Sequence, residues 1–243
     1  MINTLIQNLN LQNINIQDII IRVFVICISL SFHEMCHGWW AYRLGDDTAQ
    51  RAGRLTMNPL AHLDPIGTIM MIFAKVGWAK PVPINPNLFT RSKTMKRGIV
   101  EVSLAGPISN LLLAVVSYLL YNLAFLAQLA FFGKAQVFSS INPVIQVLMS
   151  LFYALYYTNI FLAIFNLLPI PPLDGFKIFG SLLPGKWYFK LMDYERYIGL
   201  VFLALVFFAG TAIGTVLETL SFPIRYIIET PLDFLFNMLF KLF

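Results

Sequence analysis

Long apolar runs separated by short polar stretches dominate this chain. Uncharged runs cover residues 23–32, 102–133, 143–173 and 197–217. The last three exceed about 18 residues, the length at which an apolar segment becomes a candidate membrane span. The pattern therefore predicts an all-α polytopic membrane protein with about four transmembrane helices. These helices are expected at about residues 19–44, 99–133, 143–168 and 197–217.

Three shorter stretches between the predicted spans have a different character. Residues 65–78 are apolar but too short for a comfortable span, which predicts a re-entrant or interfacial segment. Residues 52–57 and 79–84 are expected to be short extended segments at the cytoplasmic surface. Pro81 and Pro83 would confine the second segment to a sheet edge. The first segment contains no proline, so we expect it to offer an edge to which a substrate adds as a strand.

The C-terminal region carries a polar residue at every fourth position among Phe, Leu and Ile. These residues are Arg225, Glu229, Asp233, Asn237 and Lys241. The spacing predicts an amphipathic helix over 222–243 at the membrane interface, interrupted at Pro231, with a fifth span as the alternative. The whole chain, 1–243, is expected to form one domain whose core covers about 19–218.

Composition supports the membrane assignment and indicates its orientation. Of 243 residues, 58% are hydrophobic and only 12% are charged, which excludes an ordinary soluble globule. Nine basic residues lie between positions 43 and 97 and four between 177 and 196, whereas the first 21 residues contain none. The positive-inside rule therefore predicts a multi-pass cell-membrane protein with its N-terminus outside. Basic residues at an anionic inner leaflet also account for the net charge of +5 without nucleic acid.

Ionisable side chains inside the first predicted span are the clearest functional signal, because charge at membrane depth is costly. His33 and His37 are one helical turn apart, so both imidazoles project from the same face. Glu34 lies between them in the HExxH arrangement of zinc hydrolases, with two metal ligands and a general base. Because Trp39 follows closely, the site is expected beneath the aromatic interface on the cytoplasmic side.

A catalytic zinc site needs a third protein ligand. Asp174 is the strongest candidate, because it follows a proline-rich break at 166–173 near membrane depth. Such non-helical backbone is tolerated only against protein or a water-filled cavity. Glu101, which precedes an apolar span, is the alternative third ligand. His62 and Asp64 lie in a polar loop and are expected to have solvated or turn-forming roles.

Four stretches of the sequence together resemble one known family. They are residues 33–37, residues 53–59 with 62–65, residues 105–110, and residues 166–175. In this order they cover roughly residues 30–180. The chain resembles the site-2 proteases, which are intramembrane zinc metalloproteases, and particularly their compact bacterial and archaeal members.

The resemblance implies one Zn²⁺ per chain, held by His33, His37 and Asp174, with Glu34 as the general base. It also implies that Asn166 helps to hold substrate or oxyanion and that Asn110 has a supporting role there. The implied partners are the lipid bilayer and transmembrane protein or peptide substrates, such as anti-sigma factors or leftover signal peptides. These would be cut within or near their spans in regulated intramembrane proteolysis. No stretch resembles the PDZ or CBS domains of larger members of the family.

Two other classes of protein would use the same residues differently. In a transporter or ion-conducting protein, His33, Glu34 and Asp174 would line a permeation path. In a catalytically silent zinc-binding membrane scaffold, the ligands would serve stability alone. The transporter hypothesis requires the HExxH spacing to be a coincidence, and no inverted repeat is visible in the sequence.

Overall fold

The computed structural model describes residues 16–65, 67–68, 78–137, 142–184, 187, 190–191 and 193–240. Six of its helices are α2 (Ile16–Leu44), α6 (Met95–Val137), α7 (Pro143–Asn166), α8 (Asp174–Gly180), α10 (Glu195–Phe208) and α11 (Gly210–Phe240). Shorter elements are α3 (Thr48–Arg51), α4 (Pro59–His62) and the 3-10 helix η2 (Pro86–Leu88). The described part of the chain contains no β-strand, only one isolated bridge between Leu63 and Ala79.

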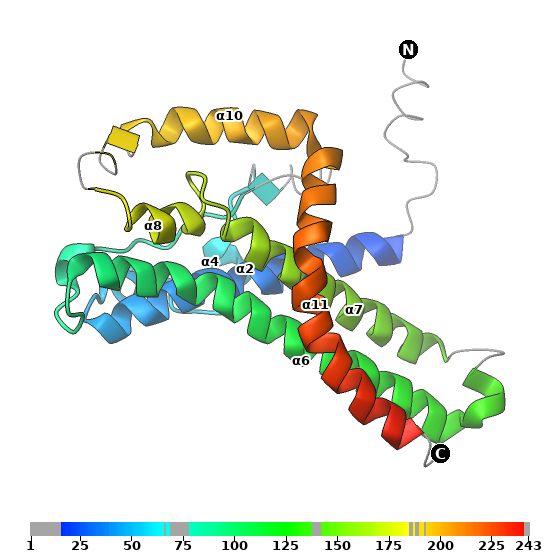
Figure 1. Ribbon diagram of the computed structural model, residues 1–243. Coiled ribbons are helices and arrows are strands. Elements are labelled where there is room, and N and C mark those ends of the chain that lie inside the picture. The colour runs from blue at the N-terminus through cyan, green and yellow to red at the C-terminus, as the bar shows by residue number, and fades with distance from the viewer. Residues whose placement is uncertain are drawn as a thin grey trace.

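The expected all-α polytopic architecture is confirmed. Three helical segments are long and apolar enough to cross a membrane: Ile16–Leu44, Met95–Phe131 and Pro143–Asn166. The bent pair α10 and α11 makes a fourth span if it is taken as one broken segment. Figure 1 shows α2, α6 and α7 running alongside one another, with α11 crossing them and α10 at the top of the view.

Asn-Pro pairs begin three of the helical elements. Asn58, Asn85 and Asn142 each accept a hydrogen bond from the backbone N–H two residues later, at 3.0–3.2 Å. The following proline occupies the first helical position, where a missing N–H costs nothing and the fixed φ suits a helix. The starts of α4, η2 and α7 are therefore encoded locally.

The single helix expected at 197–217 is instead broken into two helices. The helix ends at Phe208, the chain turns through 93° at Ala209, and α11 begins at Gly210. Apolar residues continue on both sides of the bend, so hydropathy alone cannot detect it. Gly210 lacks a side chain and is a poor helix former, which is consistent with a break at this point.

The C-terminal helix is longer and packed differently than the polar stripe suggested. α11 runs without interruption through Pro223 and Pro231 to Phe240. Two of its polar residues face the bundle: Tyr118 donates to Asp233 Oδ1 at 2.5 Å, and Tyr156 donates to Glu229 Oε1 at 2.7 Å. These two carboxylates therefore bind tyrosines of α6 and α7, because buried phenols at membrane depth need acceptors.

The prediction of an extended segment at 52–57 is also wrong. α3 ends at Arg51, and Gly53 adopts φ +66°, a left-handed conformation that only glycine adopts readily. By contrast, the 79–84 segment begins with the bridge to Leu63, and Lys80 donates its N–H to the carbonyl of His62 at 2.8 Å. Most of the expected re-entrant segment at 65–78 lies outside the described residues.

The hydrophobic core joins α6, α7 and α11. It consists of Ala114, Tyr118, Tyr156, Ile160, Ile164 and Leu217. α2 packs on α6 and α7, with Ile21 and Val25 against Leu155 of α7. This packing places the HExxH face of α2 against α6, and α8 also contacts α6.

Candidate active site

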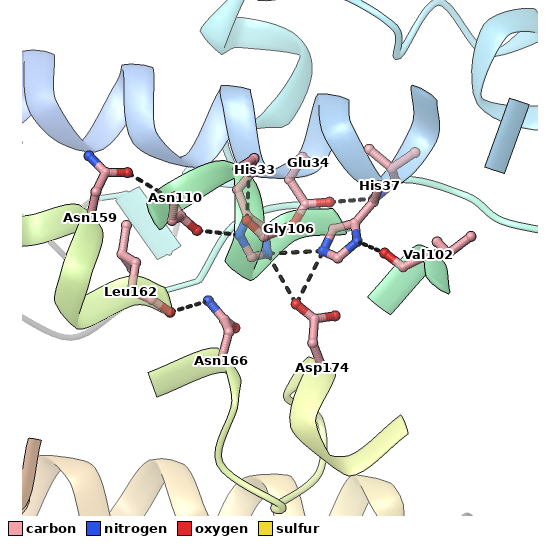
Figure 2. A network of polar contacts seen from close by, with 12 residues as sticks. His33, Glu34, His37, Val102, Gly106, Asn110, Asn159, Leu162, Asn166 and Asp174 are labelled. Carbon is pink, nitrogen blue, oxygen red and sulfur yellow. Dashed lines mark hydrogen bonds and ion pairs between the residues drawn. The ribbon is translucent and has the colours of Figure 1, made fainter. Parts of the chain in front are cut away.

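The two histidines of the HExxH motif lie side by side in the protein interior. His33 and His37 are only 5% and 6% exposed, and their Nε2 atoms are 3.0 Å apart. Both project from the same face of α2, as the four-residue spacing predicts. Figure 2 shows the two rings converging on the same space from this helix.

Asp174 completes the cluster from the start of α8. Its Oδ2 lies 3.2 Å from His33 Nε2 and 3.1 Å from His37 Nε2, and the residue is 8% exposed. The loop after α7 folds back sharply here, so a Cβ at Gly175 would collide with the carbonyl oxygens of Leu167 and Leu168. A residue without a side chain at 175 allows this tight return, which explains the Asp-Gly pair.

Charge and burial act in opposite directions on this carboxyl group. Burial raises the pKa of Asp174, but protonated His37 and His33 imidazoles beside it hold this pKa well below its usual range. The carboxylate therefore attracts positive charge to the histidine pair, supplied either by protons on the imidazoles or by a metal ion that displaces them.

The three converging atoms fit a zinc ion. Donor atoms about 2.0–2.1 Å from zinc at tetrahedral angles are about 3.3 Å apart, close to the observed separations of 3.0–3.2 Å. His33 and His37 make hydrogen bonds at Nδ1, to Asn110 Oδ1 at 2.5 Å and to the Val102 carbonyl at 2.7 Å. Neutral imidazoles protonated at Nδ1 present bare lone pairs at Nε2. Two lone pairs and a carboxylate then meet with no proton between them, which favours a cation.

These atoms form the one group with metal-ligand geometry within the described ranges of the chain. Glu101, the alternative third ligand, instead pairs with Arg97 at 2.7 Å. His62 is buried and makes a 2.8 Å hydrogen bond to the Thr56 carbonyl, and Asp64 accepts the N–H of Gly67 at 2.8 Å. Asp64 thus has the turn-forming role expected of it, whereas the solvated role expected of His62 is wrong, because this side chain is 0% exposed.

Gly106 of α6 forms the wall against which both imidazoles lie. A Cβ at this position would be 2.6 Å from His33 Nε2 and would also collide with His37 Nε2. The missing side chain at Gly106 therefore lets α6 approach α2 closely, directly beside the candidate metal ligands.

Glu34 lies next to the cluster and is held by a different part of the chain. Its Oε2 accepts the backbone N–H of Val82 at 2.9 Å. Val82 is 6% exposed, and its Cγ1 lies against Gly38 of α2. The segment 79–84 therefore contacts the helix immediately beside the HExxH motif.

The two predicted asparagines lie on opposite sides of the histidines. Asn166, the last residue of α7, is half-buried and donates to the Leu162 carbonyl at 2.9 Å. In Figure 2 its amide lies beside Asp174, on the same side of the histidine pair. Asn110 is fully buried behind His33 and donates from Nδ2 to Asn159 Oδ1 at 2.7 Å.

Asn159 and Ser29 belong to this polar network but were missed in the sequence. Both are 0% exposed, and Asn159 Nδ2 donates to Ser29 Oγ at 2.8 Å. An amide within the apolar run of α7 was the available signal, because polar groups in spans need partners and are often functional.

Comparison with known proteins agrees with this geometry. Residues 21–209 match the model of peptidase family M50. "Putative zinc metalloprotease YwhC" of Bacillus subtilis is 39% identical over 183 residues, covering 75% of this chain and 78% of that protein. "Putative zinc metalloprotease Rip2" of Mycolicibacterium smegmatis is 33% identical over 174 residues, covering 67% of this chain and 58% of that protein.

The protein of the same name from Mycobacterium tuberculosis is 30% identical over 193 residues, covering 77% of this chain and 66% of the relative. No solved structure matches the chain. The family match spans well over half of the sequence and agrees with the resemblance drawn from its motifs. The chain belongs to peptidase family M50, the site-2 protease family, and is a zinc metalloprotease.

Proposed function

We propose that this metalloprotease is an intramembrane endopeptidase that hydrolyses peptide bonds within or near transmembrane segments of other membrane proteins. The observation that carries the proposal is the position of the histidine pair. His33 and His37 lie on α2, which is apolar and long enough to cross a membrane, and both are at most 6% exposed. A peptide that reaches them has to enter the membrane-embedded part of the protein, which favours substrates that lie in the bilayer.

In this proposal His33, His37 and Asp174 hold the zinc ion. The fit of their separations to a tetrahedral ligand set supports this assignment. A bound zinc ion would polarise the scissile carbonyl and lower the pKa of a water molecule to about 7. Three protein ligands leave the fourth position open for that chemistry.

Glu34 acts as the general base in the proposed reaction. Its carboxylate takes a proton from the attacking water and later delivers it to the leaving amine. The hydrogen bond from Val82 uses Oε2 and aims the carboxylate, while an ionised carboxylate keeps further acceptor capacity for the proton.

Asn166 donates to the oxyanion or to the substrate backbone in this scheme. Its amide is half-buried beside Asp174 and has a second N–H besides the one that binds Leu162. We assign a supporting role to Asn110 instead of direct substrate contact, because it is 0% exposed and binds His33.

The proposed orientation has the N-terminus outside and the site toward the cytoplasm. Basic residues gather between positions 43 and 97 and between 177 and 196, as cytoplasmic loops require. At that end of α2, Trp39 is 46% exposed and Arg43 stacks over its ring at 5.0 Å. Such an aromatic–basic cluster suits the membrane–water interface. Residues 1–243 are proposed to act as one protease domain in regulated intramembrane proteolysis.

The test begins with a trapped substrate. Membrane proteins that co-purify with Glu34→Gln are identified and then incubated with wild-type protein in detergent, and the products are mapped by mass spectrometry. We expect zinc-dependent cuts within or beside a transmembrane segment. Glu34→Gln should retain zinc and lose this cleavage, whereas Glu101→Gln, which alters the Arg97 pair, should cleave normally.

Two results would contradict the proposal. Cuts confined to water-exposed domains of the substrates would exclude intramembrane cleavage. Full activity of Glu34→Gln would exclude Glu34 as the base.

A further inference from the structure

Asn159 is a fully buried amide whose oxygen and NH₂ group both make hydrogen bonds. Its Nδ2 donates to the carbonyl of Leu155 and to Ser29 Oγ, both at 2.8 Å, and its Oδ1 accepts from Asn110 Nδ2 at 2.7 Å. It lies on α7, whereas Ser29 lies on α2 one helical turn before His33. The amide therefore joins three spanning helices behind the histidine pair.

The direction of each hydrogen bond in this network follows from one group. The carbonyl of Leu155 only accepts, so the side of Asn159 that faces it has to be the NH₂ group. Its Oδ1 then faces Asn110, which has to present its own NH₂ group there. Asn110 consequently turns its oxygen to His33, and His33 has to carry its proton on Nδ1.

This tautomer is the one that a metal ligand needs. With the proton on Nδ1, the lone pair of His33 Nε2 points toward His37 Nε2 and Asp174 Oδ2. If Asn110 were flipped, its NH₂ group would face Nδ1 and favour the opposite tautomer, whose Nε2–H cannot bind zinc. His37 does not depend on this network, because the carbonyl of Val102 holds its Nδ1 directly.

We propose that Asn159 is a positioning residue that sets the tautomer of His33 through Asn110 and so keeps the Nε2 lone pair directed at the metal position. The statement about the metal rests on the proposed role of His33 as a ligand. Supporting partners of metal-bound histidines typically change metal affinity by about 10–100-fold. Asn159 does not contact His33 itself; it contacts Asn110, which in turn binds His33.

The direct test is the tautomer of His33 in the zinc-free protein, observed by NMR with ¹⁵N-labelled histidine. The chain has three histidines, and His37 serves as the internal reference. Asn159→Leu should convert His33 from a single Nδ1–H tautomer to a mixture and leave His37 unchanged. Asn159→Asp, which in its neutral form keeps an acceptor for Asn110 and a donor for Leu155, should preserve the wild-type pattern.

Zinc affinity, measured by chelator competition in detergent, is the second readout. Asn159→Leu should weaken zinc binding by about tenfold, at the lower end of the range for supporting partners. The effect should vanish in an Asn110→Leu background, because Asn159 acts through Asn110. The matched control is Asn122→Leu on α6, whose amide also donates to a carbonyl four residues earlier, at 2.9 Å, and which should bind zinc normally.

These readouts separate the positioning role from a purely structural one. A His33 tautomer unchanged in Asn159→Leu would overturn the proposal. It would also be overturned if the losses of zinc affinity in Asn159→Leu and Asn110→Leu multiply when the two substitutions are combined. A mixed tautomer with unchanged zinc affinity would uphold the link between Asn159 and His33 but contradict His33 as a ligand. If the leucine variant does not fold, Asn159→Ala removes the same bonds and is judged by the same two measurements.

Discussion

The backbone N–H of Val82 donates to Oε2 of Glu34 at 2.9 Å, so the acidic residue of the HExxH motif is held by a distant segment. Pro81 and Pro83 flank this donor and have no N–H of their own, which makes Val82 the single backbone donor within 81–83. The side chain of Val82 is buried against Gly38, which anchors the donor to the same helix. The orientation of the proposed base therefore depends on a loop as well as on α2.

Replacing Val82 tests this dependence. Val82→Pro removes the N–H, and since hydrogen bonds to charged groups contribute about 1.5–3 kcal/mol, kcat should fall about tenfold or more. Val82→Ala keeps the N–H and should retain most of kcat. Zinc content, measured by metal analysis, should stay at one ion per chain in both variants. Equal kcat in the two variants would show that this bond does not orient Glu34.

Asp174→Asn tests the proposed third ligand. A neutral amide oxygen is a weaker zinc ligand than a carboxylate, so we expect zinc affinity to fall beyond the about 10–100-fold effect of losing a supporting partner. The control is Asp64→Asn, because Asp64 accepts only a local bond from Gly67 and lies outside the cluster. Wild-type zinc stoichiometry and affinity in Asp174→Asn would remove this residue from the ligand set.

Asn166→Ala tests the proposed donor to the oxyanion. Loss of one such donor typically lowers kcat by about 10²–10³-fold, and we expect KM and zinc content to stay near their wild-type values. Asn122→Ala is a matched control, because both amides donate to a carbonyl four residues earlier at 2.9 Å. A change confined to KM would instead indicate that Asn166 binds the substrate without stabilising the oxyanion.

Gly106→Ala tests the wall behind the imidazoles. The added Cβ would collide with both histidine rings, so the variant should lose zinc affinity and unfold at a lower temperature. Gly214→Ala on α11 is the control, since a Cβ there meets nothing within 4 Å. Because alanine favours helix over glycine by up to about 1 kcal/mol, that control should be neutral or slightly stabilising in a thermal unfolding assay. An unchanged zinc affinity in Gly106→Ala would mean that the histidines can move away at little cost.

Much of the candidate site could be predicted because its signals are local or chemically costly. The four-residue spacing of His33 and His37 predicts a shared face in any helix. Asp174 stands out because a carboxylate beside a proline-rich break at membrane depth needs a partner. Both signals can be recognised without knowing how the helices pack.

Other features could not be predicted because they depend on packing between distant segments. The polar stripe of α11 has the same sequence pattern whether it faces lipid headgroups or the bundle, and only the buried phenols of Tyr118 and Tyr156 select the second arrangement. The bend at Ala209 lies within an uninterrupted apolar run, where hydropathy has no contrast.

The sequence by itself determined that the chain is a helical membrane protein with an HExxH pair in its first span and a carboxylate in the break after the third. Helical periodicity and the cost of charge in a bilayer act within a few residues, so a linear sequence records them. The tertiary structure alone decided which groups orient these residues. Val82 reaches Glu34 across 48 positions and Asn159 reaches Ser29 across 130, and such contacts exist only once the helices have packed.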